Sequence, residues 1–555
     1  MQQAEIVFRN GRIWTGCEDL AGVPQEASAL AVRGGKIAAV GTDEEVRAFA
    51  GAADVVDLGG RRVVPGLIDS HMHAVRAGVS WNRSLHWEDL RSLTQGLQQI
   101  EERAAATPPG TWISVVGGWH SRQLAEGRGP TRAELDEVAP DHPVYVQELY
   151  DRGTLNSAAL RACGWDDTSA EPDRGTLGRD VEGRLTGEIF GVGAFGRPIA
   201  QALATTPEDA RAGTRQMFRD FAAHGLTGVD DGGGLLITPG DYRPLYDLWR
   251  GANLDMRVRL FMSAWTRGDE VGDIAALTQV ARPDFGDELL RVAGVGEIPH
   301  LGCHDMEGLD PFALTDEAYE GLVEVVRTCV HAGWRMSVHA VLDSTLTRII
   351  DAWEQVEAET GLVRGRRFSI VHADQASEAN LDRLSRLEAG VMVQNRMMLK
   401  ATDYRQEWGE ESLAGTPPIG RMRERGIPVG GGSDATRANW YAPWASIWWL
   451  VTGESVDGVP PRGAEHRLTV AEALASYTRD AAWFTEEEGH RGRLAPGYDA
   501  DLCVPTADPF ECEAPDLRNI RSDLTVLGGR VTHASGAFAD LAPASTDALA
   551  RASAR

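Results

Sequence analysis

The residues best suited to chemistry are four histidines and one aspartate, each at or just beyond the end of an apolar run. His71 and His73 close VVPGLIDSHMH, His339 and His372 close MSVH and SIVH, and Asp434 follows IPVGGGS. Side chains at i and i+2 of a strand point to the same face, so His71 and His73 can reach one ion. Imidazole suits zinc, iron, nickel or copper. Taken singly, each residue is more often a hydrogen-bonded core or turn residue, but together they indicate a metal site.

The elements that would position these residues are strands that alternate with helices. Apolar residues recur at three- and four-residue spacing between the later strands, which is typical of helices that cover a sheet. This alternation predicts an α/β fold, a (β/α)8 TIM barrel, whose active site lies at the carboxyl ends of its strands. The eight strand candidates cover residues 63–73, 226–231, 256–265, 289–297, 335–340, 368–374, 391–394 and 427–434.

Two further regions adjoin the barrel domain, which we place at residues 63–487. Residues 1–62 and 488–540 share short β-rich runs broken by glycine turns, so we expect one composite β-sandwich built from both ends of the chain. The gap between the first two barrel strands is too long for one crossover helix. We therefore expect an inserted subdomain at about 80–200.

Composition limits the possible partners. The chain has 82 acidic and 55 basic residues and a net charge of −27, which argues against nucleic-acid and anionic-membrane binding. It has no apolar run long enough to span a membrane, and MQQAEIVFRNGRIW does not resemble a signal peptide. The six scattered cysteines are typical of free thiols in a reducing compartment. We expect a cytoplasmic protein that acts on a small molecule.

Several segments carry a family resemblance. VVPGLIDSHMH, SVHAVLDSTL, SIVHADQAS and GGSDAT resemble, in this order, strand motifs of the amidohydrolase superfamily. Within it they resemble amidohydrolase family 3, which includes N-substituted formamide deformylases and N-acyl-amino-acid hydrolases. PVYVQELYDRGTLNSAAL, EPDRGTLGRDVEGRLTGEI and GRLAPGYDADLCV are also similar, so the likeness runs from about residue 5 to 535.

The resemblance implies a mechanism and a ligand set. His71, His73, His339, His372 and Asp434 match the family's metal and catalytic positions. Metal-bound water would attack a non-peptide C–N bond of an amide or N-acyl compound, with Asp434 as general base and acid. The metal or a nearby histidine would polarise the carbonyl. A metal-dependent isomerase or decarboxylase, or an ester or lactone hydrolase, remains open on the same scaffold. A catalytically dead binding protein is disfavoured, because every ligand position keeps a competent side chain.

The number of metal ions depends on the fourth strand. Many relatives bridge two ions there with a carboxylated lysine, but LLRVAGVGEIPHLGCHDMEG contains none, and Lys36 and Lys400 are the only lysines in the chain. Arg291 lies near the expected place and cannot form a carbamate. Glu297 is either a replacement oxygen ligand or an ordinary polar residue at a strand end. We expect a divalent ion, zinc, and favour one ion over two.

Substrate contacts are harder to predict. Relatives often have a histidine before NSxAL, whereas residues 150–156 read YDRGTLN, so recognition of the substrate differs. Trp81 and Trp440 could line an aromatic pocket, and Arg291 and His304, with Cys303 beside it, could lie near the barrel mouth. The tryptophans at helical spacing after Asp434 are more typical of a core or of a homodimer surface.

Overall fold

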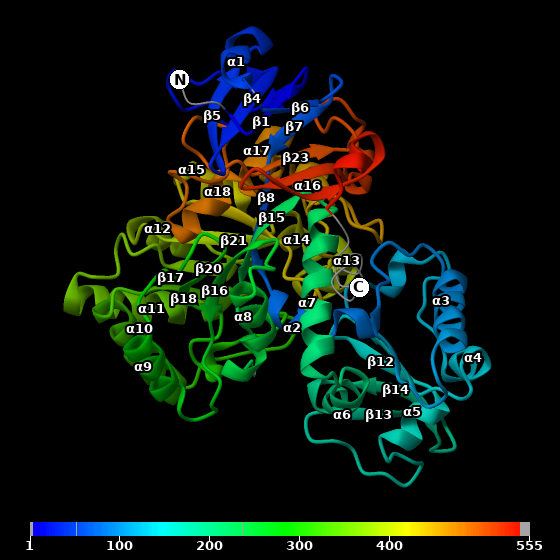
Figure 1. The fold of residues 1–555 in the computed structure, drawn as a ribbon. Helices are drawn as coiled ribbons and strands as arrows, with labels where there is room; N and C mark the ends of the chain where they lie inside the picture. The colour runs from blue at the N-terminus through cyan, green and yellow to red at the C-terminus, as the bar shows by residue number, and fades with distance from the viewer. Residues whose placement is uncertain (1–3, 52, 236, 544–555) are drawn as a thin grey trace.

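The computed structural model describes residues 4–51, 53–235 and 237–543, and its central element is an eight-stranded parallel barrel wrapped by helices (Figure 1). The strands follow one another around the barrel in chain order, and the first and last strands close it. The backbone amide of Asp434 donates to the carbonyl of His71 across this closure at 3.0 Å. The fold is therefore the predicted TIM barrel. Its strands are β8 (Leu67–Met72), β15 (Leu226–Asp231), β16 (Arg257–Met262), β18 (Leu290–Val295), β19 (Arg335–Ala340), β20 (Ser369–His372), β21 (Gly390–Gln394) and β22 (Val429–Gly432).

Burial explains why these runs form parallel strands. Every residue of β19 and β20 is buried, as in parallel sheets that are covered by helices on one face and packed by side chains on the other. The helix α10 (Asp316–His331) buries Leu322, Val326 and Cys329 on one stripe against the barrel. The main helices around the barrel are α7 (Pro207–Ala222), α8 (Arg243–Arg250), α9 (Glu270–Val280), α10 (Asp316–His331), α11 (Asp343–Thr360), α12 (Glu378–Arg386), α13 (Met397–Trp408), α15 (Ile419–Glu424), α16 (Pro443–Thr452) and α17 (Val470–Ser476).

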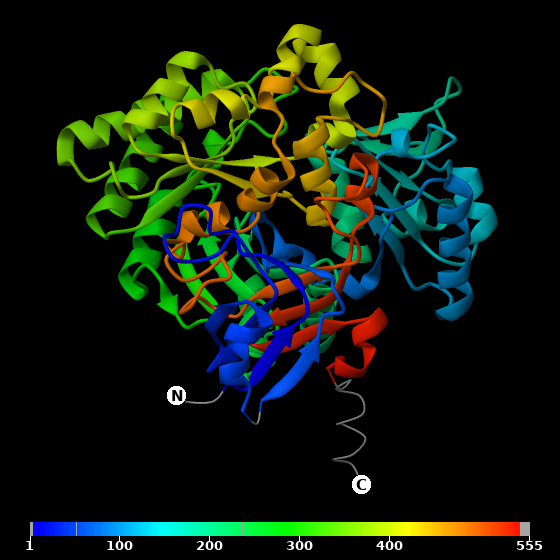
Figure 2. The same ribbon diagram turned by 90° about the horizontal axis from the view of Figure 1, so that it is seen from above.

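Both ends of the chain contribute to one pair of sheets. The strand β7 (Arg62–Pro65) pairs in antiparallel fashion with β23 (Leu502–Pro505), and Figure 2 shows the blue and red segments side by side. One sheet has the order β25 (Arg530–Ala534), β24 (Ser522–Leu527), β23, β7, β2 (Arg12–Trp14), β3 (Glu26–Ala27). The other has the order β5 (Lys36–Gly41), β4 (Ala29–Arg33), β1 (Ile6–Arg9), β6 (Asp54–Asp57). Phe8, Leu30, Val63, Leu502 and Leu524 share the core between them.

A second sheet-and-helix unit lies between β8 and β15, beside the barrel (Figure 1). Its sheet has the order β13 (Thr176–Arg179), β14 (Leu185–Phe190), β12 (Arg152–Leu155), β11 (Val144–Glu148), β10 (Ile113–Val116), β9 (Ser84–Leu85). The helices of this insert are α3 (Leu93–Ala106), α4 (Arg132–Val138), α5 (Ser157–Ala162) and α6 (Val192–Ala202). Separate apolar clusters around Trp87 and Leu155 give the insert its own core.

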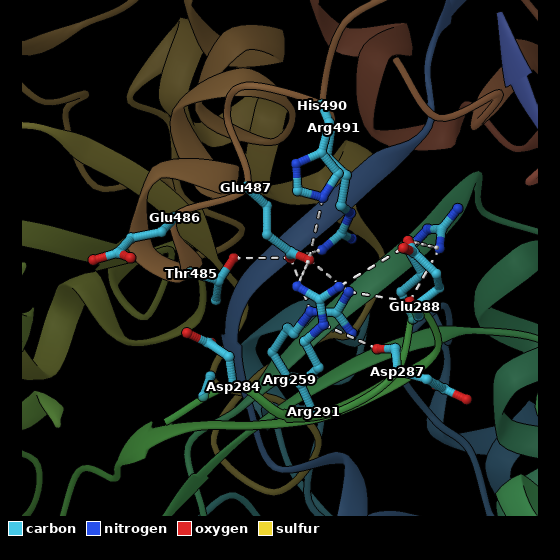
Figure 3. A network of polar contacts seen from close by, with 12 residues as sticks. Arg259, Asp284, Asp287, Glu288, Arg291, Thr485, Glu486, Glu487, His490 and Arg491 are labelled. Carbon is cyan, nitrogen blue, oxygen red and sulfur yellow. Dashed lines mark hydrogen bonds and ion pairs between the residues drawn. The ribbon is translucent and has the colours of Figure 1, made fainter. Parts of the chain in front are cut away.

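A buried ionic cluster, whose side chains Figure 3 shows, involves residues from the amino-terminal halves of the barrel strands β16 and β18. Glu487 accepts two hydrogen bonds from Arg259, at 2.7 and 2.8 Å, and contacts Arg491 and Arg291. Arg291 is the second residue of β18, so its side chain lies at the opposite end of the barrel from the predicted metal ligands. The prediction that Arg291 stands near the metal and binds substrate is therefore wrong, because Glu487 holds it at the barrel floor. Among the described residues, no helix is both long and apolar enough to cross a membrane.

Candidate metal centre

The predicted ligands come together at the carboxyl-terminal mouth of the barrel. His71 Nε2 lies 3.2 Å from Glu297 Oε2 and 3.7 Å from Asp434 Oδ1. His73 Nε2 lies 3.5 Å from Glu297 Oε1 and 3.0 Å from Asp434 Oδ1. His339 Nδ1 lies 3.8 Å from Glu297 Oε2. Side chains from the first, fourth, fifth and eighth strands of the barrel thus meet around one carboxylate.

Glu297 belongs to two overlapping groups of metal-ligand atoms. In the first group it joins His71 and His73, and in the second it joins His339 and His372, with all donor atoms of a group within 4.8 Å of one another. All five side chains are buried. His71 Nε2 forms no hydrogen bond with any residue that the structure describes. A buried, unpaired imidazole nitrogen among carboxylate oxygens fits a divalent cation.

The electrostatics of the centre also fit a cation. Burial alone would raise the pKa values of Glu297 and Asp434, but the neighbouring histidines, and Arg396 beside Asp434, hold both well below the usual range. The same two carboxylates, acting against burial, raise the pKa of His71 to about 10. Two ionised carboxylates in a buried site therefore attract positive charge.

Further contacts orient the histidine rings. His73 Nδ1 donates to the carbonyl of Gly233 at 3.0 Å, which leaves Nε2 facing the carboxylates. His339 Nε2 donates to the carbonyl of Met306 at 2.8 Å and lies 2.9 Å from Asp305, which leaves Nδ1 for the centre. Two of the predicted ligands also have a left-handed backbone conformation, since the φ values of His372 and Asp434 are 80° and 56°. Such conformations are uncommon for residues other than glycine and concentrate at functional sites.

Sequence reasoning missed Arg396, which stands at the edge of this centre. It lies two residues beyond β21, and its Nη2 is 3.0 Å from Asp434 Oδ2 and 3.2 Å from His372 Nε2. Burial and this guanidinium hold the pKa of His372 well below its usual range, so the ring is neutral. The only feature of the sequence that could have indicated Arg396 is its position just after the seventh strand. The end of that strand lies at the same edge of the barrel as the ends of the strands that carry the predicted ligands.

Of the other residues predicted to contact substrate, some line the cavity and some do not. His304 lines the cavity and stacks on His339, with ring centroids 3.7 Å apart. Cys303 next to it is buried, with its thiol directed to the carbonyl of Ala318. Trp81 and Trp440 do not line the cavity, which corrects the prediction. Trp81 donates its indole N–H to Asp220 and packs in the core, and Trp440 is 1% exposed in the same core.

A cavity of about 390 Å³ opens from the centre toward the insert. His73, Glu297 and Asp434 line its barrel side, and Val192, Phe195 and Ile199 of α6 line the opposite side. Across the same boundary, the buried ammonium of Lys400 pairs with Asp151 of the insert at 2.5 Å and with Glu307 of the barrel at 2.7 Å. The insert therefore forms a wall of the cavity, held to the barrel by ion pairs.

Comparison with known proteins agrees with this architecture. The amidohydrolase family model matches residues 54–533. The N-substituted formamide deformylase of Arthrobacter pascens is 27% identical over 91% of this chain and 94% of its own. An uncharacterized metal-dependent hydrolase from Pyrococcus furiosus superposes with a TM-score of 0.65, at 21% identity over 91% of this chain and all of its own. Atrazine chlorohydrolase TrzN from Arthrobacter aurescens TC1, in a structure complexed with zinc, has a TM-score of 0.54 at 16% identity, over 99% of each chain.

The chain belongs to the amidohydrolase family, which confirms the resemblance found in its motifs. This membership identifies it as a hydrolase of carbon–nitrogen bonds.

Proposed function

We propose that this protein is a metal-dependent hydrolase that cleaves a non-peptide amide or N-acyl bond in the cavity beside Glu297. The observation that carries the proposal is the placement of Glu297 and Asp434 among four buried histidines at the cavity wall. The relative named as an N-substituted formamide deformylase supports an amide as the substrate. Water activated in this site would attack an ester or lactone in the same way, so the assay must compare amides with esters and lactones.

His71, His73 and Glu297 would hold one divalent cation tightly, and zinc is the ion that we expect. His339, His372 and Glu297 offer a second position. That position would be weaker, because Arg396 brings positive charge to 3.2 Å from His372 Nε2. When bound, the cation supplies Lewis-acid chemistry, which makes water more acidic and polarises the scissile carbonyl.

Asp434 would transfer the protons. Its carboxylate is ionised, since its pKa lies well below the usual range, so it can accept a proton from water and return it to the leaving nitrogen. One oxygen faces His73 at 3.0 Å and the other accepts from Arg396 at 3.0 Å. These contacts fix the carboxylate at the cavity wall, within reach of a bound amide.

The test is a screen of N-formyl and N-acyl amines, with matched esters and lactones, against protein reconstituted with zinc, manganese, iron or nickel. Released amine is measured, and the reaction is repeated in H₂¹⁸O. Release of amine with ¹⁸O in the acid product supports the proposal. Product without ¹⁸O would identify an isomerase or decarboxylase instead, and turnover of esters alone would exclude an amidase.

A further inference from the structure

Two arginines line the cavity next to the metal centre without a carboxylate partner. Arg76 lies in α2 (Ala74–Gly78), three residues after His73, and Arg437 follows Asp434 by three residues. Neither lies within ion-pair distance of a carboxylate in the described part of the chain. Burial, together with the positive charge of Arg76, lowers the pKa of Arg437 to about 10. Two like charges thus stand close together at the cavity wall.

Several other arginines of the interior are paired with carboxylates. Arg257 forms hydrogen bonds with both oxygens of Asp501, and Arg259 does the same with Glu487. Leaving a buried guanidinium unpaired is costly, because desolvation is not offset by an opposite charge. Arg462, which lies over the Trp449 ring in the core, also has no carboxylate partner among the described residues, but Arg76 and Arg437 line a cavity that a ligand can enter. The missing negative charge is therefore expected from a ligand.

The backbone around Arg437 is held tightly. A Cβ added to Gly117 of the insert would lie 2.4 Å from the Arg437 Cα atom and 2.5 Å from its carbonyl oxygen. The insert thus packs its backbone directly against this residue, and the amide of Gly118 points to the same carbonyl at 3.5 Å. A guanidinium on a clamped backbone is pre-organised, which favours specific recognition of an anion.

The rest of the wall restricts the remainder of the ligand. Val192, Phe195 and Ile199 of α6, with Leu235, form an apolar surface. Arg174 and Arg267 lie at the exposed rim. A ligand that meets the metal centre, the arginine pair and this surface must combine an amide, an anionic group and an apolar part.

We propose that Arg76 and Arg437 form an anion subsite, and that the substrate is an amide bearing a carboxylate or a similar anion next to an apolar group. This inference rests on the proposed function. In the reaction, the C–N bond breaks, the oxygen of water bonds to the carbonyl carbon, and a proton from water reaches the leaving nitrogen. The anionic group is unchanged, and it orients the amide by paired hydrogen bonds to guanidinium, which matches carboxylate geometry.

The test uses pairs of substrates that differ only in the anion. N-formylphenylalanine is compared with N-formyl-2-phenylethylamine, and N-benzylsuccinamic acid with N-benzylbutyramide, so that the carboxylate lies on the amine side or the acyl side. In at least one pair, kcat/KM for the anion should exceed that for the neutral compound by about 10- to 100-fold, the range for a charged hydrogen bond. Arg76→Gln and Arg437→Gln should bring this ratio close to one. Arg161→Gln, an exposed residue of α5 with the same change of charge, should leave it unaltered.

Equal turnover of both members of each pair by the wild type would overturn the anion subsite, as would variants that keep the wild-type ratio. Calorimetric binding of phenylacetate, with phenylacetamide as the neutral control, separates this failure from failure of the proposed function. If no amide is hydrolysed, the proposed function fails. The subsite still stands if Arg76→Gln and Arg437→Gln weaken phenylacetate binding at least 10-fold with unchanged metal content, and it falls if they bind it as the wild type does.

Discussion

Replacing Glu487 with glutamine should destabilise the barrel strongly without touching the cavity. Glu487 and Arg259 are each 1% exposed, and Arg491 is equally buried (Figure 3). The glutamine side chain keeps the shape but removes the charge, and its NH₂ group would face guanidinium donors. Arg259 and Arg491 would then lose the carboxylate to which they donate.

The size of the effect follows from this burial. Breaking a buried ion pair by removing one partner costs about 3–5 kcal/mol, whereas an exposed pair contributes about 0–1 kcal/mol. An unfolding entropy of about 2.1 cal/mol/K per residue corresponds to about 1.2 kcal/mol/K for 555 residues. The melting temperature of Glu487→Gln should therefore fall by about 3–4 °C if the chain unfolds cooperatively.

Scanning calorimetry and urea unfolding measure this loss, with Glu486→Gln as the matched control. Glu486 is the preceding residue, and its side chain is 48% exposed while it pairs with Arg335. The control should lose less than about 1 kcal/mol. Equal losses of stability in the two variants would show that the buried cluster contributes no more than a surface ion pair.

Three further predictions concern the charge of Glu487, proton transfer by Asp434 and the pairing of β7 with β23. The difference in the free energy of unfolding between the wild type and Glu487→Gln should become smaller as the pH falls. The pKa of Glu487 in the folded protein lies well below its value of about 4.3 in the unfolded chain. The stabilisation by Glu487 is therefore complete above pH ~4.3 and is lost as the pH falls through the pKa of the folded state. Urea unfolding at several pH values checks this, and a constant gap would contradict it. Asp434→Asn should keep most of its metal, measured by elemental analysis, but lose about 10²- to 10⁴-fold in kcat, because an amide cannot carry the proton. Near wild-type turnover would assign the proton transfer to another group. Deletion of residues 496–555 should speed amide hydrogen exchange in β7 and β4, because β7 loses its partner strand and the shared core loses Leu502 and Leu524. Unchanged exchange would show that the N-terminal strands are stable alone.

Local sequence pattern was sufficient for the barrel. The β-branched, fully buried runs and the helical spacing between them predict strands and helices that the structure contains, from β8 to β22. The boundary between β7 and β8 could not be predicted from the local sequence. The single run 63–73 divides between β7, which pairs with the C-terminal strand β23, and β8, which enters the barrel. Nothing within that run reveals which sheet each half joins.

The site was predictable where topology alone places residues together. The ends of parallel strands share one edge, so His71, His339 and Asp434 could be brought together from sequence. Side chains whose place depends on packing could not. Trp81 follows the histidine strand but packs inward, and Arg291 points to the barrel floor because Glu487, almost 200 residues later, returns there to pair with it.

We infer that His71, His73 and Glu297 hold a divalent cation. Elemental analysis of protein purified without chelator and dialysed against metal-free buffer measures this directly. We expect about one ion per chain in the wild type and in Arg161→Gln. A His71→Asn, His73→Asn double variant that keeps the wild-type circular dichroism spectrum should hold less than about a tenth of that amount. A double variant that retains its metal, or a hydrolytically active wild type that contains none, would contradict the claim.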